Sequence, residues 1–259
     1  MSLLAELTAG SVADAEARRT ERPLAAVERL AAAQPAARDA LTALAPADHV
    51  KVIAEVKRAS PSRGDLASIP DPAHQAGLYE QGGASAISVL TEQRRFKGSL
   101  DDLAAVKASV GLPVLRKDFI AEPYQVFEAR AFGADIVLLI VAALDQETLE
   151  SLHFLIGRLG MTALVEAHSA EEVSRALDIG ASLIGVNARD LSTFELDRDL
   201  FGRLADDIPS GVIKVAESAV KSADDVARYR EAGADVVLVG EALVTGGDPV
   251  RTLGELLAA

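Results

Sequence analysis

The stretch that decides the fold reads GADIVLLI over Gly133–Ile140, and the same pattern occurs three more times. The other copies are GASAISVL at Gly83–Leu90, GASLIGVN at Gly180–Asn187 and GADVVLVG at Gly233–Gly240. In each copy a glycine of the kind that ends helices leads at once into an apolar run typical of a buried strand. The copies begin about fifty residues apart, which is too long for one strand–helix unit and suits two.

Further apolar runs lie before or between these copies, and together with them they predict eight strands: Val50–Val56, Pro113–Leu115, Thr162–Val165 and Val212–Val215. Helical patterns fill the gaps, at Asp71–Gln81, Leu100–Ser109, Pro123–Phe132, Gln146–Leu159, Ala170–Ile179, Leu200–Ala205, Ala223–Ala232 and Pro249–Leu257. This alternation predicts an α/β fold, a closed (β/α)8 barrel of the TIM type. An open doubly wound sheet is the alternative, but it usually has fewer strands and rarely repeats in even quarters.

The segment before the first strand is rich in Ala, Glu and Arg and has helical periodicity over Leu3–Leu44, interrupted by Pro23 and Pro35. We expect two or three helices there. Residues 1–48 are then an extension packed on a single barrel domain that spans residues 1–259. The extension can act as a plug, which periodicity favours, or as a lid that contributes to the pocket.

Composition narrows the classes of function. The chain has no cysteine, which excludes disulfides, thiolate metal ligands and cysteine nucleophiles. Its net charge of −13 opposes binding to nucleic acid or anionic membranes. The start lacks a basic leader, and the longest apolar run, Ile136–Leu144, is too short to span a membrane. We expect a cytoplasmic protein that acts on a small molecule, with a monomer as the working expectation.

Active sites of such barrels lie where the strands end, so the last residues of each strand are the informative ones. Alternation along the strands directs six polar side chains into the barrel mouth, namely Glu55, Lys57, Lys117, Glu166, Asn187 and Glu217. Arg189 is expected beside them. Charges that merely neutralise one another at a solvated rim are the plain alternative. Six together favour a binding site, because buried charges are costly unless they pair or bind something. Desolvation in such a site can lower the pKa of a lysine, and the lysine can then act as a general acid.

A phosphate site is expected in the loops after the seventh and eighth strands. Ser218 offers a hydroxyl and an N–H, and Gly240 allows close backbone approach. We expect the Glu241 side chain to point away while its N–H contributes. The four histidines have no metal-ligand spacing, and His168, which shares parity with Glu166, is expected to be a supporting or solvated residue.

Four motifs in this order resemble those of the indole-3-glycerol-phosphate synthase family of tryptophan biosynthesis: Glu55–Ser62 (EVKRASPS), Leu115–Phe119 (LRKDF), Gly185–Leu191 (GVNARDL) and Ala216–Ser218 (AES). The resemblance runs from about Val50 to the C-terminus. It implies ring closure of a phosphorylated carboxyphenylamino-deoxyribulose with loss of carbon dioxide and water. It also implies that no metal or organic cofactor is needed.

The resemblance also implies roles for individual residues. Lys117 would be the general acid that activates the substrate carbonyl, and Glu166 the general base or its proton-transfer partner. Lys57 would contact the substrate carboxylate or phosphate and share the acid role, while Glu55 would help in dehydration. The remaining implied contacts are with substrate hydroxyls and the ring nitrogen (Asn187, Glu217), the anthranilate carboxylate (Arg189), the aromatic ring (Phe119, Leu191) and the anion (Ser60, Ser218, Ala219, Gly240, Glu241).

One position departs from the family pattern, since Ala219 stands where glycine is usual. A positive φ at Ala219 would strain the alanine. Because Ala219 lies in the expected phosphate loop, the substitution affects the phosphate contact more than the reaction. The polar segment Arg58–Gly64 is suited to a lid over the site.

The sequence is also compatible with two other functions. A sugar-phosphate isomerase of the same pathway also has a phosphate-binding barrel, but that family typically uses a cysteine base and lacks the helical extension. A barrel that binds the phosphorylated ligand without turnover is the second alternative. It would not need Lys57, Lys117 and Glu166 inside its pocket.

Overall fold

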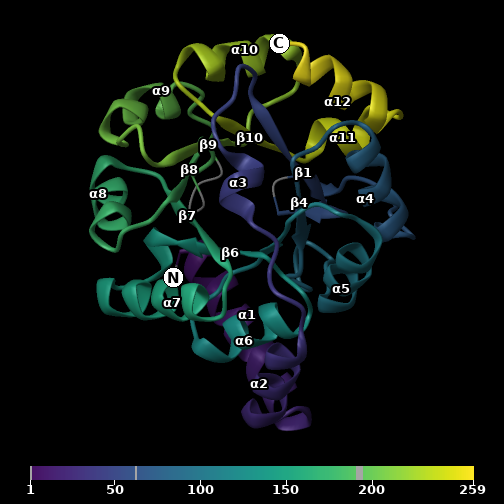
Figure 1. Cartoon of the computed structure of the whole chain (residues 1–259), viewed down its shortest axis with the longest axis vertical. Helices are drawn as coiled ribbons and strands as arrows, with labels where there is room; N and C mark the ends of the chain where they lie inside the picture. Colours follow the sequence, from purple (N-terminus) through teal and green to yellow (C-terminus); the bar gives the residue numbers. More distant parts are fainter. Residues whose placement is uncertain (1, 62, 191–194) are drawn as a thin grey trace.

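The computed structural model describes residues 2–61, 63–190 and 195–259. Within them, eight parallel strands close into a barrel in the order β1-β10-β9-β8-β7-β6-β5-β4, which confirms the predicted fold (Figure 1). The barrel strands are β1 (Lys51–Val56), β4 (Ala86–Leu90), β5 (Val114–Lys117), β6 (Ile136–Ile140), β7 (Thr162–Ala167), β8 (Leu183–Asn187), β9 (Ile213–Glu217) and β10 (Val236–Val239).

Helices surround the barrel: α4 (Pro72–Gln81), α5 (Leu100–Ser109), α6 (Pro123–Ala131), α7 (Gln146–Arg158), α8 (Ala170–Asp178), α9 (Leu200–Leu204), α10 (Ala223–Glu231) and α12 (Pro249–Leu257). Many of these helices begin at a side chain that accepts a backbone N–H, as Asp71 does for α4 and Ser169 for α8. The repeated glycines that follow α4 and α6, Gly83 and Gly133, have φ of 94° and 92°. The recurring sequence pattern is therefore a left-handed helix end followed by a strand.

Alternation along each strand separates two cores. On β1, Ile53 points into the barrel and packs with Leu115, Leu164 and Leu238. Val52, its neighbour, belongs to the layer between the strands and the outer helices. Because both faces of every strand are covered, the strands read as continuous apolar runs. The polar strand ends stand out against this background.

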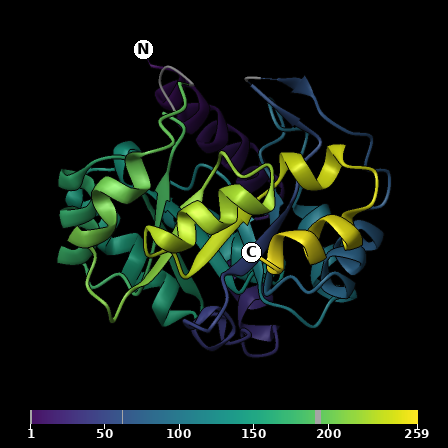
Figure 2. The same cartoon turned by 90° about the horizontal axis from the view of Figure 1, so that it is seen from above.

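The N-terminal segment forms α1 (Leu3–Glu21), α2 (Leu24–Ala33) and α3 (Ala40–Leu44). Ala40 and Leu44 of α3 pack into the barrel-interior core, and Figure 1 shows α3 across the end of the barrel where the strands begin. In Figure 2 the N-terminus lies at the opposite end from α2. Leu4 and Leu7 of α1 join the same core near Phe119. The plug is thus formed by α3, while α1 reaches toward the end where the strands stop.

The structure also contains short elements that the sequence pattern did not predict. A two-stranded antiparallel hairpin, β2 (Ala59–Ser60) with β3 (Gly64–Asp65), overlaps the expected lid Arg58–Gly64 and extends one residue beyond it, and α11 (Glu241–Thr245) follows β10. Two 3-10 turns, η1 (Val141–Ala143) and η2 (Ala205–Asp207), complete the described elements. The hairpin strands have two residues each and the 3-10 turns three, which is too short for a periodicity that a sequence pattern could detect. In the described part of the chain, no helix combines the length and the hydropathy needed to cross a membrane.

Candidate active site

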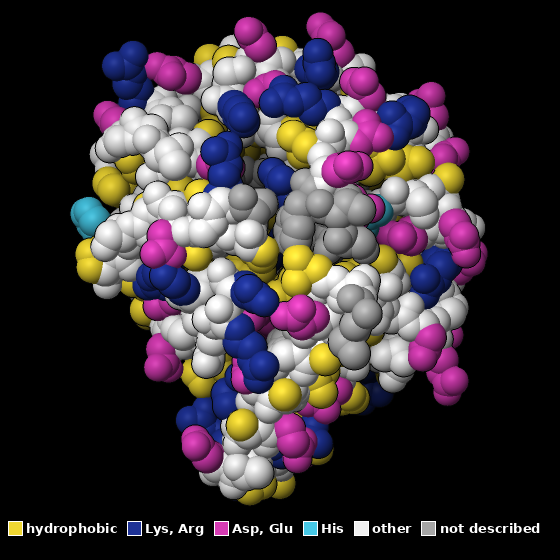
Figure 3. Space-filling model, turned by 180° about the vertical axis from the view of Figure 1, so that it is seen from behind, with side chains coloured by type: hydrophobic (Ala, Val, Ile, Leu, Met, Phe, Trp, Pro, Cys, Tyr) yellow, Lys and Arg dark blue, Asp and Glu magenta, His cyan; other side chains and the backbone are white. Residues whose placement is uncertain are grey.

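The carboxyl ends of the strands open into a cavity of about 590 Å³. Figure 3 views this end of the barrel and shows a central hollow bordered by Lys and Arg side chains. All the site residues predicted from the sequence line the cavity except Leu191, which lies outside the described residues. A volume of this size suits a ligand of drug-like or sugar-phosphate dimensions.

Lys117 stands at the centre of the site. Its Nζ lies 3.2 Å from Glu166 Oε2 and 3.3 Å from Glu217 Oε2, and its side chain is 15% exposed. Burial alone favours the neutral amine, but the attraction of Glu166, Glu217 and Glu55 outweighs it and raises the pKa of Lys117 above its ordinary value. The expectation of a lowered lysine pKa is therefore wrong for Lys117. Strand alternation brings carboxylates, not cations, around its ammonium.

Glu166 and Glu217 form a buried pair of carboxylates whose pKa values shift in opposite directions. Burial raises the pKa of Glu217 to about 8, with the charge of Glu166 adding to the effect and that of Lys117 opposing it. Burial also works against the charge of Glu166, but Lys117, His168 and a hydrogen bond from Asn187 outweigh it and lower its pKa. Of the two, Glu217 is therefore the carboxyl that holds its proton more strongly, and Glu166 is the one that ionises first.

The backbone leaves room for this pair. A side chain at Gly185 of β8 would collide with the Glu217 carboxylate, so glycine there is what allows the close approach. Asn187, at the end of the same strand, accepts a hydrogen bond from the Ser218 hydroxyl at 2.8 Å and from the Arg189 N–H at 3.0 Å. Its amide oxygen is thereby turned toward the loop after β9, which leaves the amide nitrogen for Glu166.

Glu55 and Lys57 form a second acid–base pair on the other side of the mouth, with Nζ and Oε2 2.5 Å apart. Gly240 passes close to them, because a Cβ atom there would lie 2.5 Å from Glu55 Oε2 and 3.0 Å from Lys57 Nζ. With φ of −123°, Gly240 does not need the conformational freedom of glycine. The glycine is needed because a side chain would displace this ion pair.

The expected phosphate end combines two unusual backbone positions. Ser218 and Ala219 have φ of 69° and 65°, so two non-glycine residues in succession adopt the left-handed conformation after β9. Ala219 is therefore strained, in the way the sequence suggested for a positive φ. Glu241 begins α11, and its carboxylate pairs with Arg63 of the β2–β3 hairpin at 2.6 Å. Arg63 therefore neutralises the one acidic group expected beside an anion.

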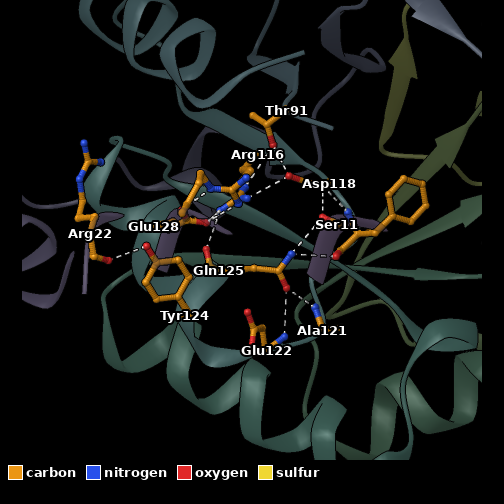
Figure 4. Close-up of polar contacts among 12 residues, drawn as sticks. Ser11, Arg22, Thr91, Arg116, Asp118, Ala121, Glu122, Tyr124, Gln125 and Glu128 are labelled. Carbon is orange, nitrogen blue, oxygen red and sulfur yellow. Dashed lines mark hydrogen bonds and ion pairs between the residues drawn. The ribbon is translucent and has the colours of Figure 1, made fainter. Parts of the chain in front are cut away.

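A buried polar network holds the end of β5, where Lys117 lies (Figure 4). Asp118 accepts hydrogen bonds from Thr91 at 2.6 Å, from Ser11 of α1 at 2.8 Å and from the Phe119 N–H at 2.9 Å. Arg116, which is fully buried, pairs with the same carboxylate at 3.0 Å. Because Arg116 and Asp118 flank Lys117 on the chain and face away from it, they fix the backbone from which the lysine projects.

Several cavity residues were not found from the sequence: Leu90, Phe96, Leu196, Arg63 and Lys221. Leu90 ends β4, so the same alternation would have indicated it. Phe96 lies in the loop after β4, where its ring is 6.2 Å from that of Phe119, and no pattern predicts such a loop position. Among the residues that the structure describes, no group of three or more His, Asp or Glu side chains is arranged to hold a metal ion.

Comparison with known proteins gives consistent matches over the whole chain. Residues 4–256 match the family model described as indole-3-glycerol phosphate synthase. The indole-3-glycerol phosphate synthase of Leifsonia xyli subsp. xyli is 74% identical over 255 residues, which is 98% of each chain. That of Mycolicibacterium gilvum is 59% identical and covers 100% of this chain and 94% of its own.

Solved structures resemble this one in fold alone. The 3-hexulose-6-phosphate synthase of Salmonella typhimurium superposes with a TM-score of 0.67 at 17% identity, over 81% of this chain and 97% of the other. The N-acetylmannosamine-6-phosphate 2-epimerase of Clostridium perfringens gives a TM-score of 0.62 at 16% identity, over 83% of this chain and 95% of the other.

Proposed function

The chain belongs to the indole-3-glycerol phosphate synthase family, and from that premise we propose how its residues carry the reaction. The enzyme is a carboxy-lyase of tryptophan biosynthesis. It closes the ring of 1-(2-carboxyphenylamino)-1-deoxyribulose 5-phosphate to give indole-3-glycerol phosphate, with loss of one carbon dioxide and one water. The sugar-phosphate isomerase alternative is thereby set aside.

We propose that Lys117 is the general acid for ring closure. A weakly nucleophilic arene carbon must attack a ketone, so the carbonyl oxygen needs a proton as the new carbon–carbon bond forms. The observation that carries this assignment is the Lys117 ammonium held between Glu166 and Glu217 at 3.2 and 3.3 Å. These carboxylates keep the amine protonated and aim it into the cavity. Loss of carbon dioxide then restores the aromatic ring.

Glu166 is proposed as the base that removes a proton when water is lost. It is the ionised member of the Glu166–Glu217 pair, and full burial keeps bulk water from competing for its lone pair. Lys57, paired with Glu55 at the end of β1, is placed to protonate the departing hydroxyl, with Glu55 orienting it. The protonated Glu217 and Asn187 are proposed to position the substrate hydroxyls and the ring nitrogen.

The two ends of the substrate need opposite surroundings. Phe119 and the neighbouring Phe96 supply an apolar wall for the aromatic ring of the substrate. Arg189, which lines the same cavity, is proposed to bind the carboxylate of the substrate. The phosphate is proposed to lie at the other end, on the Ser218 and Ala219 backbone and on Gly240 and Glu241 N–H groups, with Ser60 closing over it. Leu191 stays a proposed contact of the ring.

We also propose that residues 1–259 act as one barrel domain, with residues 1–48 as an extension packed on it. A monomer in the cytoplasm, with neither nucleic acid nor membrane as partner, fits the net charge of −13, because such a charge repels polyanions.

Replacement of Lys117 tests the assignment. Lys117→Met should lower kcat by about 10²–10⁴-fold, the usual contribution of a positioned acid, while circular dichroism stays unchanged. Lys117→Arg, which keeps the charge, guards against misfolding of the neutral variant and should also be slow. Lys51→Met is the matched control, because Lys51 bonds the Ala43 carbonyl at the opposite end of the barrel. Near-normal turnover in Lys117→Met would remove Lys117 as the acid.

A further inference from the structure

A histidine lies directly behind Glu166. His168 follows the end of β7, its side chain is 12% exposed, and its Nε2 is 3.5 Å from Glu166 Oε1. Lys117 approaches the other carboxylate oxygen, Oε2. Glu166 is therefore contacted by one basic group on each oxygen.

Among the described residues, the two facing atoms have no hydrogen-bond partner. Glu166 Oε1 and His168 Nε2 are both buried, and within the described residues neither makes a hydrogen bond. Buried polar atoms are nearly always bonded, and unpaired ones cost about 1–3 kcal/mol each. Each atom is the partner that the other needs. A shift of a few tenths of an ångström would bring them within bonding distance, and catalytic hydrogen bonds often tighten when the ligand binds.

The other side of the imidazole is fixed by Glu172, the third residue of α8. Glu172 Oε2 lies 3.3 Å from His168 Nδ1 and accepts the His168 backbone N–H at 2.8 Å. Ser169 caps the same turn by accepting the Glu172 N–H. With Nδ1 donating to Glu172, Nε2 is the nitrogen presented to Glu166.

The surroundings favour the charged imidazole. Burial lowers the pKa of His168, but Glu172, Glu166 and Glu217 outweigh it, so the net effect is to raise that pKa. On its outer side, His168 lines a second hollow together with charged groups of the segment after β8, namely Asp190, Glu195, Asp197, Arg198, Asp199 and Arg203. His168 therefore stands between the buried Glu166 and a surface that carries four acids and two arginines.

We propose that His168 is a positioning residue of the reaction, which, held by Glu172, pairs with Glu166 Oε1, keeps this carboxylate ionised and turns its second oxygen toward Lys117. The inference rests on the proposed role of Glu166 as the base. It assigns to His168 and Glu172 a function beyond packing, and it predicts that their loss affects the ionisation of Glu166 more than substrate binding.

The test is the pH dependence of kcat for His168→Gln, His168→Ala and Glu172→Gln. Removing the cation should raise the pKa of Glu166, so the acid limb of kcat should move to higher pH by about one unit or more, with KM changed less than about twofold. Glutamine keeps a hydrogen-bond donor but no charge. His168→Gln should therefore have a higher kcat than His168→Ala on the pH-independent plateau, while its acid limb stays shifted to higher pH. Glu172→Gln should shift the limb less. His74→Gln, at an exposed position on α4, is the matched control and should match the wild type.

A second readout does not depend on turnover. With four histidines in the chain, the imidazole NMR signal that disappears in His168→Gln identifies His168. Its titration should move to lower pH in Glu172→Gln and in Glu166→Gln. Unshifted acid limbs in all His168 and Glu172 variants, or an unchanged titration, would overturn the proposal. Wild-type turnover in Glu166→Gln would instead refute the proposed role of Glu166 itself, so the two failures are distinct.

Discussion

Replacing Ala219 with glycine should stabilise the protein. Ala219 has φ of 65°, and the left-handed conformation costs an L-residue about 1–2 kcal/mol. Glycine avoids this strain but gains freedom in the unfolded chain, worth about 0.5–1 kcal/mol. The difference, about 1 kcal/mol, corresponds to a Tm increase of about 2–4 °C for a domain of this size.

Substrate affinity should hardly change. Glycine keeps the backbone N–H that is proposed to contact the phosphate and can adopt the same left-handed turn, so KM should stay within about twofold. The assays are thermal unfolding by circular dichroism and steady-state kinetics. Ala45→Gly is the matched control: Ala45 is half-buried in a loop with φ of −53°, so glycine there should lower Tm.

Two outcomes would refute this reasoning. If Tm of Ala219→Gly does not rise, the alanine is not strained in the folded protein. If KM instead falls about tenfold at constant Tm, the alanine impairs phosphate binding and does not destabilise the fold.

Two further predictions concern the mouth of the barrel. Gly240→Ala should lower kcat by about 10²-fold without unfolding the protein, because the new Cβ would lie 2.5 Å from Glu55 Oε2 and displace its ion pair with Lys57. Gly211→Ala is the control, because a Cβ at Gly211 meets nothing within 4 Å. Equal turnover in the two variants would contradict the argument. Glu217, with its pKa raised to about 8, should lose its proton above that pH, so wild-type kcat should decline on the alkaline side. Glu217→Gln keeps a donor at every pH and should lack this decline in a kcat profile over pH 6–10; an identical decline would show that another group titrates there.

The barrel and the inward set of polar residues could be predicted because they depend on short-range regularities. A helix-ending glycine such as Gly133 fixes where a strand begins, and alternation then decides that Lys117 faces inward while Arg116 faces outward. The same alternation placed Glu166 and Glu217 at one mouth.

What could not be predicted depends on distances between segments far apart in the chain. The direction of the Lys117 pKa shift follows from three carboxylates on three other strands, and their combined attraction could not be weighed against burial without coordinates. Ser11 bonds Asp118 across 107 residues of sequence, and no local pattern indicates such a contact. His168 shares parity with Glu166, but only the structure reveals that the two side chains face each other.

The measurement that tests the central claim most directly is indole fluorescence after mixing the purified protein with the carboxyphenylamino sugar phosphate, with and without a chelator. An acid–base site built on Lys117 and Glu166 predicts that fluorescence rises at the same rate in both conditions. Substrate binding without any rise in fluorescence, or a rise that the chelator abolishes, would contradict it.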